Sequence, residues 1–232
     1  ILRNGKLSTY KNDLQSFTLL RFLAPELDEN KELILVIDPD IFAIKDPIEI
    51  LNYHNENSDI SCTFYDNIPR SEMMLIDTKK IKWNFKKIKK DIFNLKMDYS
   101  YLMKLSFDHN LKINKISKRF NSHDIIHEDT ILLHTTNRIT QPWKINLKVD
   151  FDRNYKKSYL IKENLKRILK KKYDQFALSN KYILHENTLV VKSIQNLFKD
   201  AYSSNSITRE MIKTSLANDY ISEEFCKQCM IF

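Results

Sequence analysis

Residues 33–40 read Leu-Ile-Leu-Val-Ile-Asp-Pro-Asp. Five apolar residues in succession are too few for a buried helix, so they predict a core β-strand over 33–37. Pro39 has no N–H to continue a ladder, which places Asp38 at the end of that strand. Residues two apart in an extended segment share a face, so Asp38 and Asp40 can point into one crevice.

Two carboxylates this close repel each other unless a cation lies between them. Hard oxygen ligands suit Mn²⁺ or Mg²⁺, and in open α/β sheets ligands gather at the carboxyl ends of strands. The pair Asp38 and Asp40 therefore predicts a divalent metal site. The alternative is that Asp-Pro-Asp is only a turn in which Asp38 caps the next segment. Both interpretations stay open at this point.

A second short apolar run, over 130–133, ends at His134. A neutral imidazole can supply the nitrogen ligand of a mixed carboxylate and histidine metal site, although a structural role is the alternative for a lone histidine. Trp143, further along, offers a flat face to a sugar ring or serves as a core anchor. The segment after His134 is rich in groups that bind phosphate and sugar oxygens. They belong to Thr135, Thr136, Asn137, Arg138, Gln141 and Lys144.

The rest of the first 150 residues alternates strands with helices. Apolar spacing predicts a helix over 14–27 and an amphipathic, lysine-rich helix over 79–95. Short β-type runs over 60–64 and 73–76 predict two further strands. This alternation predicts an α/β layered fold.

The sequence changes character near Asp152, where we place a domain boundary. Residues 153–175 hold nine Lys or Arg against two acids, whereas the first sixty residues hold six against eleven. Apolar residues continue at helical spacing after residue 160. We therefore expect a catalytic domain over 1–152 and a basic helical extension over 153–232. A solvated helix face is the usual reason for such regional charge.

The composition is that of an ordinary globular protein, with 232 residues and a net charge of +8. No apolar run approaches the ~20 residues that cross a bilayer, and the opening residues lack a secretory pattern, so we expect a cytoplasmic protein. Cys62, Cys226 and Cys229 are too few and too scattered for a disulfide framework. Reduced thiols are the expected state.

Four segments, in the right order, resemble the glycosyltransferase family 8 superfamily, and most of all its bacterial and cyanobacterial branch. They are 16–27 (SFTLLRFLAPEL), 36–43 (VIDPDIFA), 71–77 (SEMMLID) and 134–151. The resemblance implies a GT-A fold, which is a Rossmann-like mixed sheet flanked by helices, here with a C-terminal helical extension. It also implies transfer of a hexose from a nucleotide-sugar donor, a UDP-sugar, with retention of the anomeric configuration. The acceptor, whether glycan, lipid or protein, and the nucleophile stay unassigned.

The resemblance also implies roles for single residues. Asp38 and Asp40 match the D-x-D that holds Mn²⁺ or Mg²⁺, and His134 matches the third protein ligand. The expected donor-binding residues are Arg21, Ser71, Asn137, Arg138, Gln141 and Lys144. The expected contacts to the sugar or the acceptor are Asn121, Asp124 and Trp143.

The chain departs from the family pattern after His134. Asn137 stands where family members have a glycine, and Gln141 precedes Pro142 with one additional residue between. The usual phosphate-binding lysine is therefore not at its expected place. We expect Arg138 or Lys144 to replace it as the cation that steadies the leaving diphosphate.

Two alternatives of other classes follow from further departures. The family's Asp-Gln-Asp acceptor motif is missing, which favours a catalytically degenerate scaffold whose tail docks a partner, self-associates or contacts the inner membrane surface. A basic nucleic-acid-binding module is the other alternative, with lysines over 79–96 and 153–172 near several tyrosines. No RNA-reading motif accompanies them, so we expect no nucleic-acid partner. The chain begins close to Arg21, and we expect it to lack the first nucleotide-binding strands.

Overall fold

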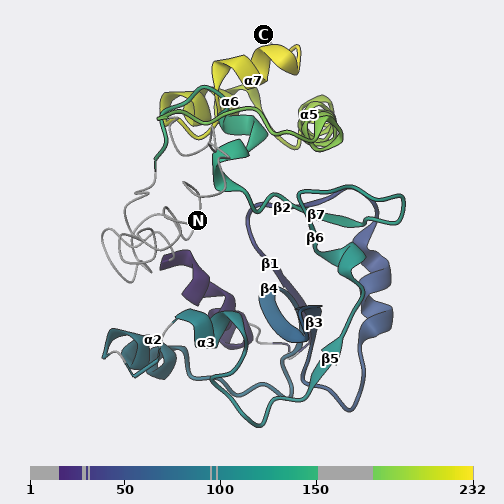
Figure 1. The fold of residues 1–232 in the computed structure, drawn as a ribbon, viewed down its shortest axis with the longest axis vertical. Helices are drawn as coiled ribbons and strands as arrows, with labels where there is room; N and C mark the ends of the chain where they lie inside the picture. Colours follow the sequence, from purple (N-terminus) through teal and green to yellow (C-terminus); the bar gives the residue numbers. More distant parts are fainter. Residues whose placement is uncertain are drawn as a thin grey trace, which may run out of the picture. The chain divides into compact units, whose positions relative to one another are not determined.

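The computed structural model describes residues 16–27, 30, 32–94, 96–97, 99–150 and 180–231 (Figure 1). The chain forms two compact units, Ile1–His134 and Thr135–Phe232, and each is described here by itself. The predicted boundary at Asp152 and the predicted basic helix over 153–175 lie outside the described residues.

The first unit contains a four-stranded mixed sheet with the order β1-β4-β3-β5 (Figure 1). Its strands are β1 (Leu33–Ile37), β3 (Ile60–Tyr65), β4 (Ile68–Asp77) and β5 (Ile113–Lys115). β4 pairs antiparallel with both β1 and β3, while β5 pairs parallel with β3. The hairpin between β3 and β4 turns on Asp66 and Asn67, whose positive φ values of 51° and 60° suit a two-residue turn of Asp and Asn.

β1 (Leu33–Ile37) has the predicted limits, but it is not buried as a core strand would be. Residues 33–36 are only half-buried, and Ile37 is 40% exposed. Within the described part of the chain β1 lies at the edge of its sheet and pairs with β4 alone. An unbroken apolar run is typical of a central strand, but an edge strand such as β1 can have one as well, so the run alone does not predict the position of a strand in its sheet.

A second, three-stranded sheet has the order β2-β7-β6. Its strands are β2 (Ile41–Ala43), β6 (Ser122–His123) and β7 (Leu132–His134). β7 pairs antiparallel with β2 and parallel with β6. His134 therefore lies opposite Ile41 on one side and His123 on the other. This register brings the residue that precedes β2, Asp40, next to the end of β7.

The core of the first unit lies on both faces of β4. Met74 and Ile76 belong to a buried cluster that includes residues of the helices η1 (Ser16–Leu23), α2 (Phe85–Phe93) and α3 (Tyr99–Met103). Met73 belongs to a second cluster with residues of sheet β2-β7-β6, of η2 (Pro47–Tyr53) and of η3 (Lys118–Phe120). Alternate side chains of a strand point to opposite faces, so β4 holds helices on one side and the second sheet on the other.

Two predicted helices of this unit differ from the structure in their form or limits. Residues 16–27 are helical as the 3₁₀ helix η1 and the short helix α1 (Ala24–Leu27), and residues 14–15 lie outside the described range. The lysine-rich helix α2 begins at Phe85 rather than near residue 79. Asn84 caps it by accepting a hydrogen bond from the Lys87 N–H at 2.8 Å, a start signal that the apolar spacing alone did not reveal.

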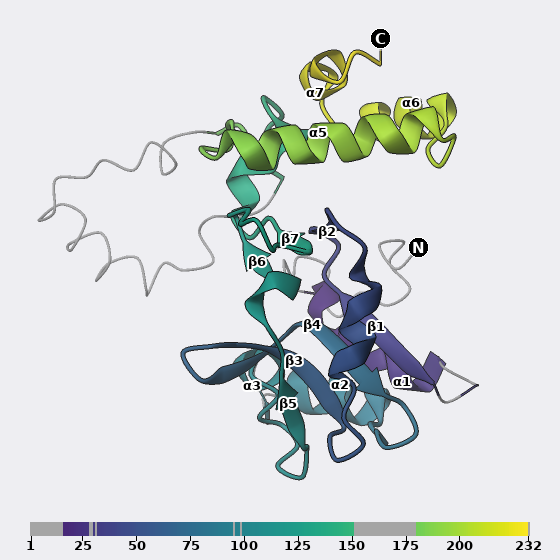
Figure 2. The ribbon, with the colours of Figure 1, turned by 90° about the vertical axis from the view of Figure 1, so that its right-hand side faces the viewer.

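The second unit consists of short 3₁₀ turns followed by helices, and its C-terminal helices are confirmed. The turns are η4 (Arg138–Thr140) and η5 (Pro142–Lys144), and the helices are α5 (Thr188–Ser203, seen along its length in Figure 2), α6 (Arg209–Ala217) and α7 (Glu223–Gln228). The side chains of Asn187, Thr208 and Ser222 cap the three helices. Among the described residues, no helix combines the length and the apolar character that a membrane crossing needs.

The three cysteines are free thiols, as predicted, and all are buried. Cys226 and Cys229 lie in and directly after α7, where Phe225 meets Phe198 of α5 with their ring centroids 5.1 Å apart. Burial raises the pKa of Cys229 to about 11, so this thiol is protonated and unreactive at neutral pH. The C-x-x-C pair therefore packs as part of the helical core.

Candidate metal centre

Asp38 and Asp40 lie in a tight turn between the two sheets of the first unit. The Asp38 N–H donates to the Glu72 carbonyl at 3.0 Å, and the Ile41 N–H donates back to the Asp38 carbonyl at 3.0 Å. Pro39 occupies the second position of this turn, where its fixed φ is favourable. The segment is thus the turn that the sequence allowed, and this turn also directs both aspartates toward His134.

The two aspartates and His134 form a group that can hold a metal ion. Each offers one ligand atom, and the three atoms lie within 4.8 Å of one another. His134 Nε2 lies 3.3 Å from Asp40 Oδ1. Two ligands about 2.1 Å from one ion and at right angles lie about 3 Å apart, so this spacing fits a shared ion. Two carboxylates and one imidazole suit Mn²⁺ better than Mg²⁺, because Mg²⁺ prefers ligands that are all oxygen atoms.

Arg21 holds Asp38 from the side of η1. Its Nε donates to Asp38 Oδ1 at 2.6 Å, and Nη2 forms an ion pair with Oδ2. Nη1 donates to Ser71 Oγ at 2.9 Å, so the structure brings Arg21, Ser71 and Asp38 together. Burial raises the pKa of Asp38 to about 6, although the Arg21 charge opposes this shift. Each Asp38 oxygen accepts one bond from Arg21 and keeps a second lone pair for a cation.

Behind His134 lies a buried polar network that sequence reasoning missed in part. His134 Nδ1 lies 2.9 Å from Asn121 Oδ1, and Asn121 Nδ2 donates to Glu72 Oε2 at 3.1 Å. His123 Nε2 also lies 3.1 Å from Glu72 Oε2. Burial disfavours a charged Glu72, but hydrogen bonds from His123 and Asn121 and the charges of His123 and His134 outweigh it and lower the Glu72 pKa to about 2. Glu72 is therefore ionised at neutral pH.

Glu72 and His123 were not predicted as site residues. In the sequence, Glu72 is one charged residue before an apolar run, and His123 lies eleven residues before His134. The parallel pairing of β6 with β7 places His123 opposite His134. Glu72 lies in β4 and reaches both histidines from there. Tyr65 stacks on His123 at 4.2 Å between ring centroids and supports it from the other side. The signal available in the sequence was a second histidine, His123, shortly before the predicted ligand His134.

The other predicted residue of the first unit, Asp124, lies directly after β6. Its backbone N–H donates to the His134 carbonyl at 2.9 Å, and its φ of 54° lies in the left-handed region that Asp tolerates. Its side chain is half-buried. Asp124 thus helps to fix the backbone at the end of β7.

The remaining predicted residues lie in the second unit. Asn137 is exposed before η4, Arg138 and Trp143 are half-buried, and Gln141 is buried. The Lys144 side chain is 9% exposed and forms an ion pair with Asp150. Lys144 therefore has a strong intramolecular partner in this unit.

Asp150→Asn should weaken the second unit in a pH-dependent way. Burial opposes ionisation of Asp150, but bonds from Lys144 and Tyr182 outweigh it and lower the Asp150 pKa. A carboxyl with a lowered pKa adds stability above its unfolded pKa of about 3.9 and loses that contribution as pH falls further. We expect a lower melting temperature for the variant at neutral pH and a vanishing difference in strong acid.

The measurement is the melting temperature of both proteins over a pH series. Asp200→Asn, on the exposed face of α5, is the matched control and should show no such pH trend. A deficit of Asp150→Asn that stays constant down to strong acid would contradict the ion pair as its cause.

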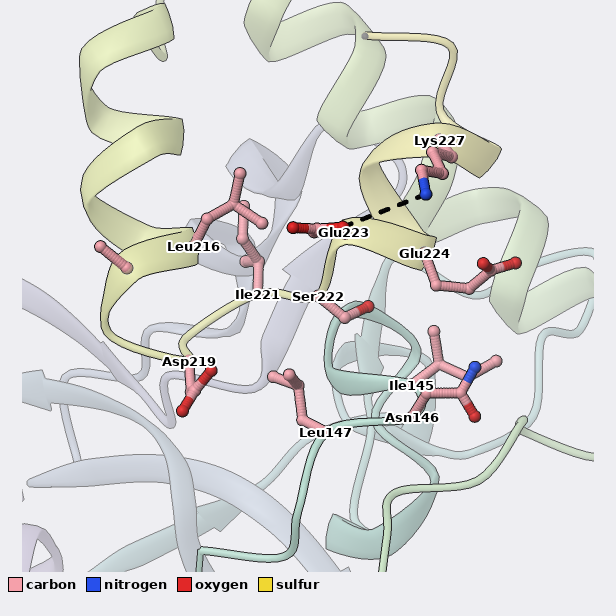
Figure 3. Close-up of a pocket in the computed structure, with 11 residues that line it drawn as sticks. Ile145, Asn146, Leu147, Leu216, Asp219, Ile221, Ser222, Glu223, Glu224 and Lys227 are labelled. Carbon is pink, nitrogen blue, oxygen red and sulfur yellow. Dashed lines mark ion pairs between the residues drawn. The ribbon is translucent and has the colours of Figure 1, made fainter.

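The second unit also contains a cavity of about 540 Å³ (Figure 3). It lies among the end of α6, the start of α7 and the segment 145–147, and three acids, Asp219, Glu223 and Glu224, line it. Lys227 also lines it and pairs with Glu223 at 4.0 Å. Because negative charge predominates, the cavity disfavours a diphosphate.

No protein-family model and no curated protein matches the chain. Among solved structures, it is similar to the glycosyltransferase GlyE of Streptococcus pneumoniae TIGR4, with a TM-score of 0.42 at 16% identity over 73% of this chain and 48% of that one. The apo form of GlyE gives a TM-score of 0.40 at 15% identity over 76% and 50%. The chain thus spans about half the length of the solved glycosyltransferase. A likeness at this TM-score carries no argument about function, which rests on the site itself.

Proposed function

We propose that the chain is a metal-dependent glycosyltransferase of the family 8 type, with a GT-A fold and a UDP-sugar donor. The observation that supports it best is the convergence of Asp38, Asp40 and His134 from two sheets of one unit, with ligand atoms within 4.8 Å of one another. The same three residues lie in the segments of this chain that resemble family 8, 36–43 and 134–151. The sugar is proposed to be a hexose, transferred with retention.

The residues around this centre have separate tasks in the proposal. A divalent cation bound there supplies positive charge for the two donor phosphates as the glycosidic oxygen departs. Asp38 and Asp40 provide the hard oxygen ligands, and Arg21 keeps Asp38 ionised and oriented. His134 provides a nitrogen ligand whose ring is fixed from behind by Asn121.

The donor and acceptor contacts stay predictions. Those for the donor are Arg21, Ser71, Asn137, Arg138, Gln141 and Lys144, and those for the sugar or acceptor are Asn121, Asp124 and Trp143. In the first unit Arg21 and Ser71 already contact Asp38 or each other, so a donor that reaches them also reaches the metal centre.

Thermal unfolding with UDP and Mn²⁺ tests the proposal. We expect UDP to raise the melting temperature only when Mn²⁺ is present, because Asp38 and Asp40 alone would repel a diphosphate and a cation held by them would supply the positive charge that it needs. At 100 times Kd a ligand adds about 2.7 kcal/mol of stability. For a protein of this size, each kcal/mol raises the melting temperature by about 2–4 °C. An equal shift with UDP in the presence of a chelator would contradict a metal-dependent donor site.

A catalytically degenerate scaffold is the second candidate. One observation favours it: Lys144, a candidate replacement for the missing phosphate-binding lysine, is ion-paired with Asp150. A panel of UDP-sugars with and without Mn²⁺ separates the two candidates. A transferase releases UDP from at least one donor in the panel, whereas the scaffold binds Mn²⁺ and UDP without turnover.

A further inference from the structure

Asn121 lies at the centre of a fully paired polar network. Its side chain is fully buried, and both amide hydrogens have acceptors: Thr63 Oγ1 at 3.1 Å and Glu72 Oε2 at 3.1 Å. Its carbonyl oxygen faces His134 Nδ1 at 2.9 Å. Each polar atom of this side chain therefore has a partner within the protein.

The direction of each hydrogen bond follows from Glu72. An ionised carboxylate only accepts hydrogen bonds, so the Asn121 amide must turn its NH₂ group toward Glu72. Its oxygen then faces His134, and an amide oxygen only accepts. His134 Nδ1 must therefore carry a hydrogen, which in the neutral ring leaves the lone pair on Nε2. Nε2 is the atom that lies 3.3 Å from Asp40.

We propose that Glu72 and Asn121 are positioning residues that fix the tautomer of His134, so that its Nε2 lone pair is directed to the metal centre. The inference rests on the proposed function in one respect, since it takes the ion to lie at Asp38, Asp40 and His134. A ligand histidine whose second nitrogen is held by an amide or a carboxylate has a defined ring orientation and greater basicity. The Glu72 and Asn121 pair supplies both effects from the far side of the ring.

The hydrogen bonds of this network favour one of the two groups of residues that could hold a metal ion. Glu72, His123 and His134 also offer ligand atoms within 4.8 Å of one another. His134 Nδ1 lies 3.8 Å from Glu72 Oε2, but it already bonds Asn121, and Glu72 Oε2 already faces His123 and Asn121. An ion in this second group would have to break those bonds. The geometry thus assigns Glu72 and His123 to the support of His134.

Histidine ¹⁵N NMR of the full chain tests the proposal without relying on activity. In alkaline buffer with saturating Mg²⁺, which is diamagnetic, the ring is neutral and a cation replaces the proton between Nε2 and Asp40, so the wild-type His134 should carry its hydrogen on Nδ1. Its signals are identified by their loss in His134→Gln. In Glu72→Gln the new amide can donate to Asn121 Oδ1, so the Asn121 amide can rotate and offer its NH₂ group to His134. We expect a mixture of tautomers and a Mn²⁺ affinity lower by about tenfold or more.

Asn121→Leu removes the acceptor and should have the same two effects; if it does not fold, Glu72→Gln decides. Ser61→Ala is the control, because Ser61 is buried in the same strand as Thr63 and hydrogen-bonds to Tyr53 outside the network. A wild-type ring protonated on Nε2, or an unchanged tautomer and Mn²⁺ affinity in Glu72→Gln, would overturn the proposal. Wild-type protein with the Nδ1 tautomer but no Mn²⁺ binding would instead refute the proposed function and the link to an ion.

Discussion

Asp40→Asn should abolish specific Mn²⁺ binding and any Mn²⁺-dependent turnover of a UDP-sugar. Asp40 is the carboxylate nearest the imidazole of His134, and its oxygen lies 3.3 Å from Nε2. Asparagine keeps the shape but removes the negative charge, and an amide oxygen binds a divalent cation more weakly than a carboxylate does. Loss of an outer partner alone typically costs 10–100-fold in metal affinity, so loss of a direct ligand should cost more than ~100-fold. Titration of Mn²⁺ followed by EPR measures the free ion directly.

The control for this change is Asp46→Asn. Asp46 lies in the same unit and caps η2 by accepting a bond from the Ile48 N–H at 2.9 Å. Asparagine caps about as well as aspartate, so both stability and Mn²⁺ affinity should stay at the wild-type values. His134→Gln should match Asp40→Asn in Mn²⁺ affinity. If Asp40→Asn bound Mn²⁺ as tightly as Asp46→Asn, the metal centre would have to lie elsewhere.

Several features of the fold were predictable because they depend on local sequence. The apolar run and Pro39 predicted both limits of β1. The runs over 73–76 and 130–133 predicted the second half of β4 and most of β7, but they did not show that β4 already begins at Ile68. Spacing of two residues predicted that Asp38 and Asp40 point into one crevice, and the structure brings them together through a local turn rather than through the extended segment on which the prediction rested. The structure brings both aspartates to His134, 94 residues after Asp40, through the register of β2 on β7.

The rest of the site depends on pairing between distant strands, which alternation of apolar residues does not encode. Nothing near Glu72 indicates that β4 runs past β1 at the level of Asp38, and nothing near His123 indicates that its short strand joins β7. The edge position of β1 is another non-local property. Asn121 was predicted as a sugar contact by resemblance, whereas its complete burial follows from packing between the sheets.

Arg21→Met should destabilise the first unit by about 3–5 kcal/mol at neutral pH, the usual cost of leaving one partner of a buried ion pair alone. Arg21 and Asp38 have side chains only 6% and 9% exposed. Methionine replaces the apolar stem of Arg21 but none of its bonds to Asp38 and Ser71. Asp38 has a pKa of about 6 in the presence of Arg21, and without that charge its pKa should rise further. Urea unfolding gives the change in free energy.

The pH dependence and two further variants identify the cause of that loss. A carboxyl with a raised pKa is charged, and costly to bury, only above that pKa, so the deficit of Arg21→Met should shrink as pH falls through the higher Asp38 pKa of the variant, and it should reach its lowest value near the wild-type pKa of about 6. Arg21→Met combined with Asp38→Asn removes the stranded charge and should recover most of the stability, but not Mn²⁺ binding. Arg119→Met breaks the Arg119 and Glu49 pair, whose side chains are 29% and 41% exposed, and should cost at most about 1 kcal/mol. Equal losses for Arg21→Met and Arg119→Met, or additive losses in the double variant, would show that Arg21 does not act by neutralising Asp38.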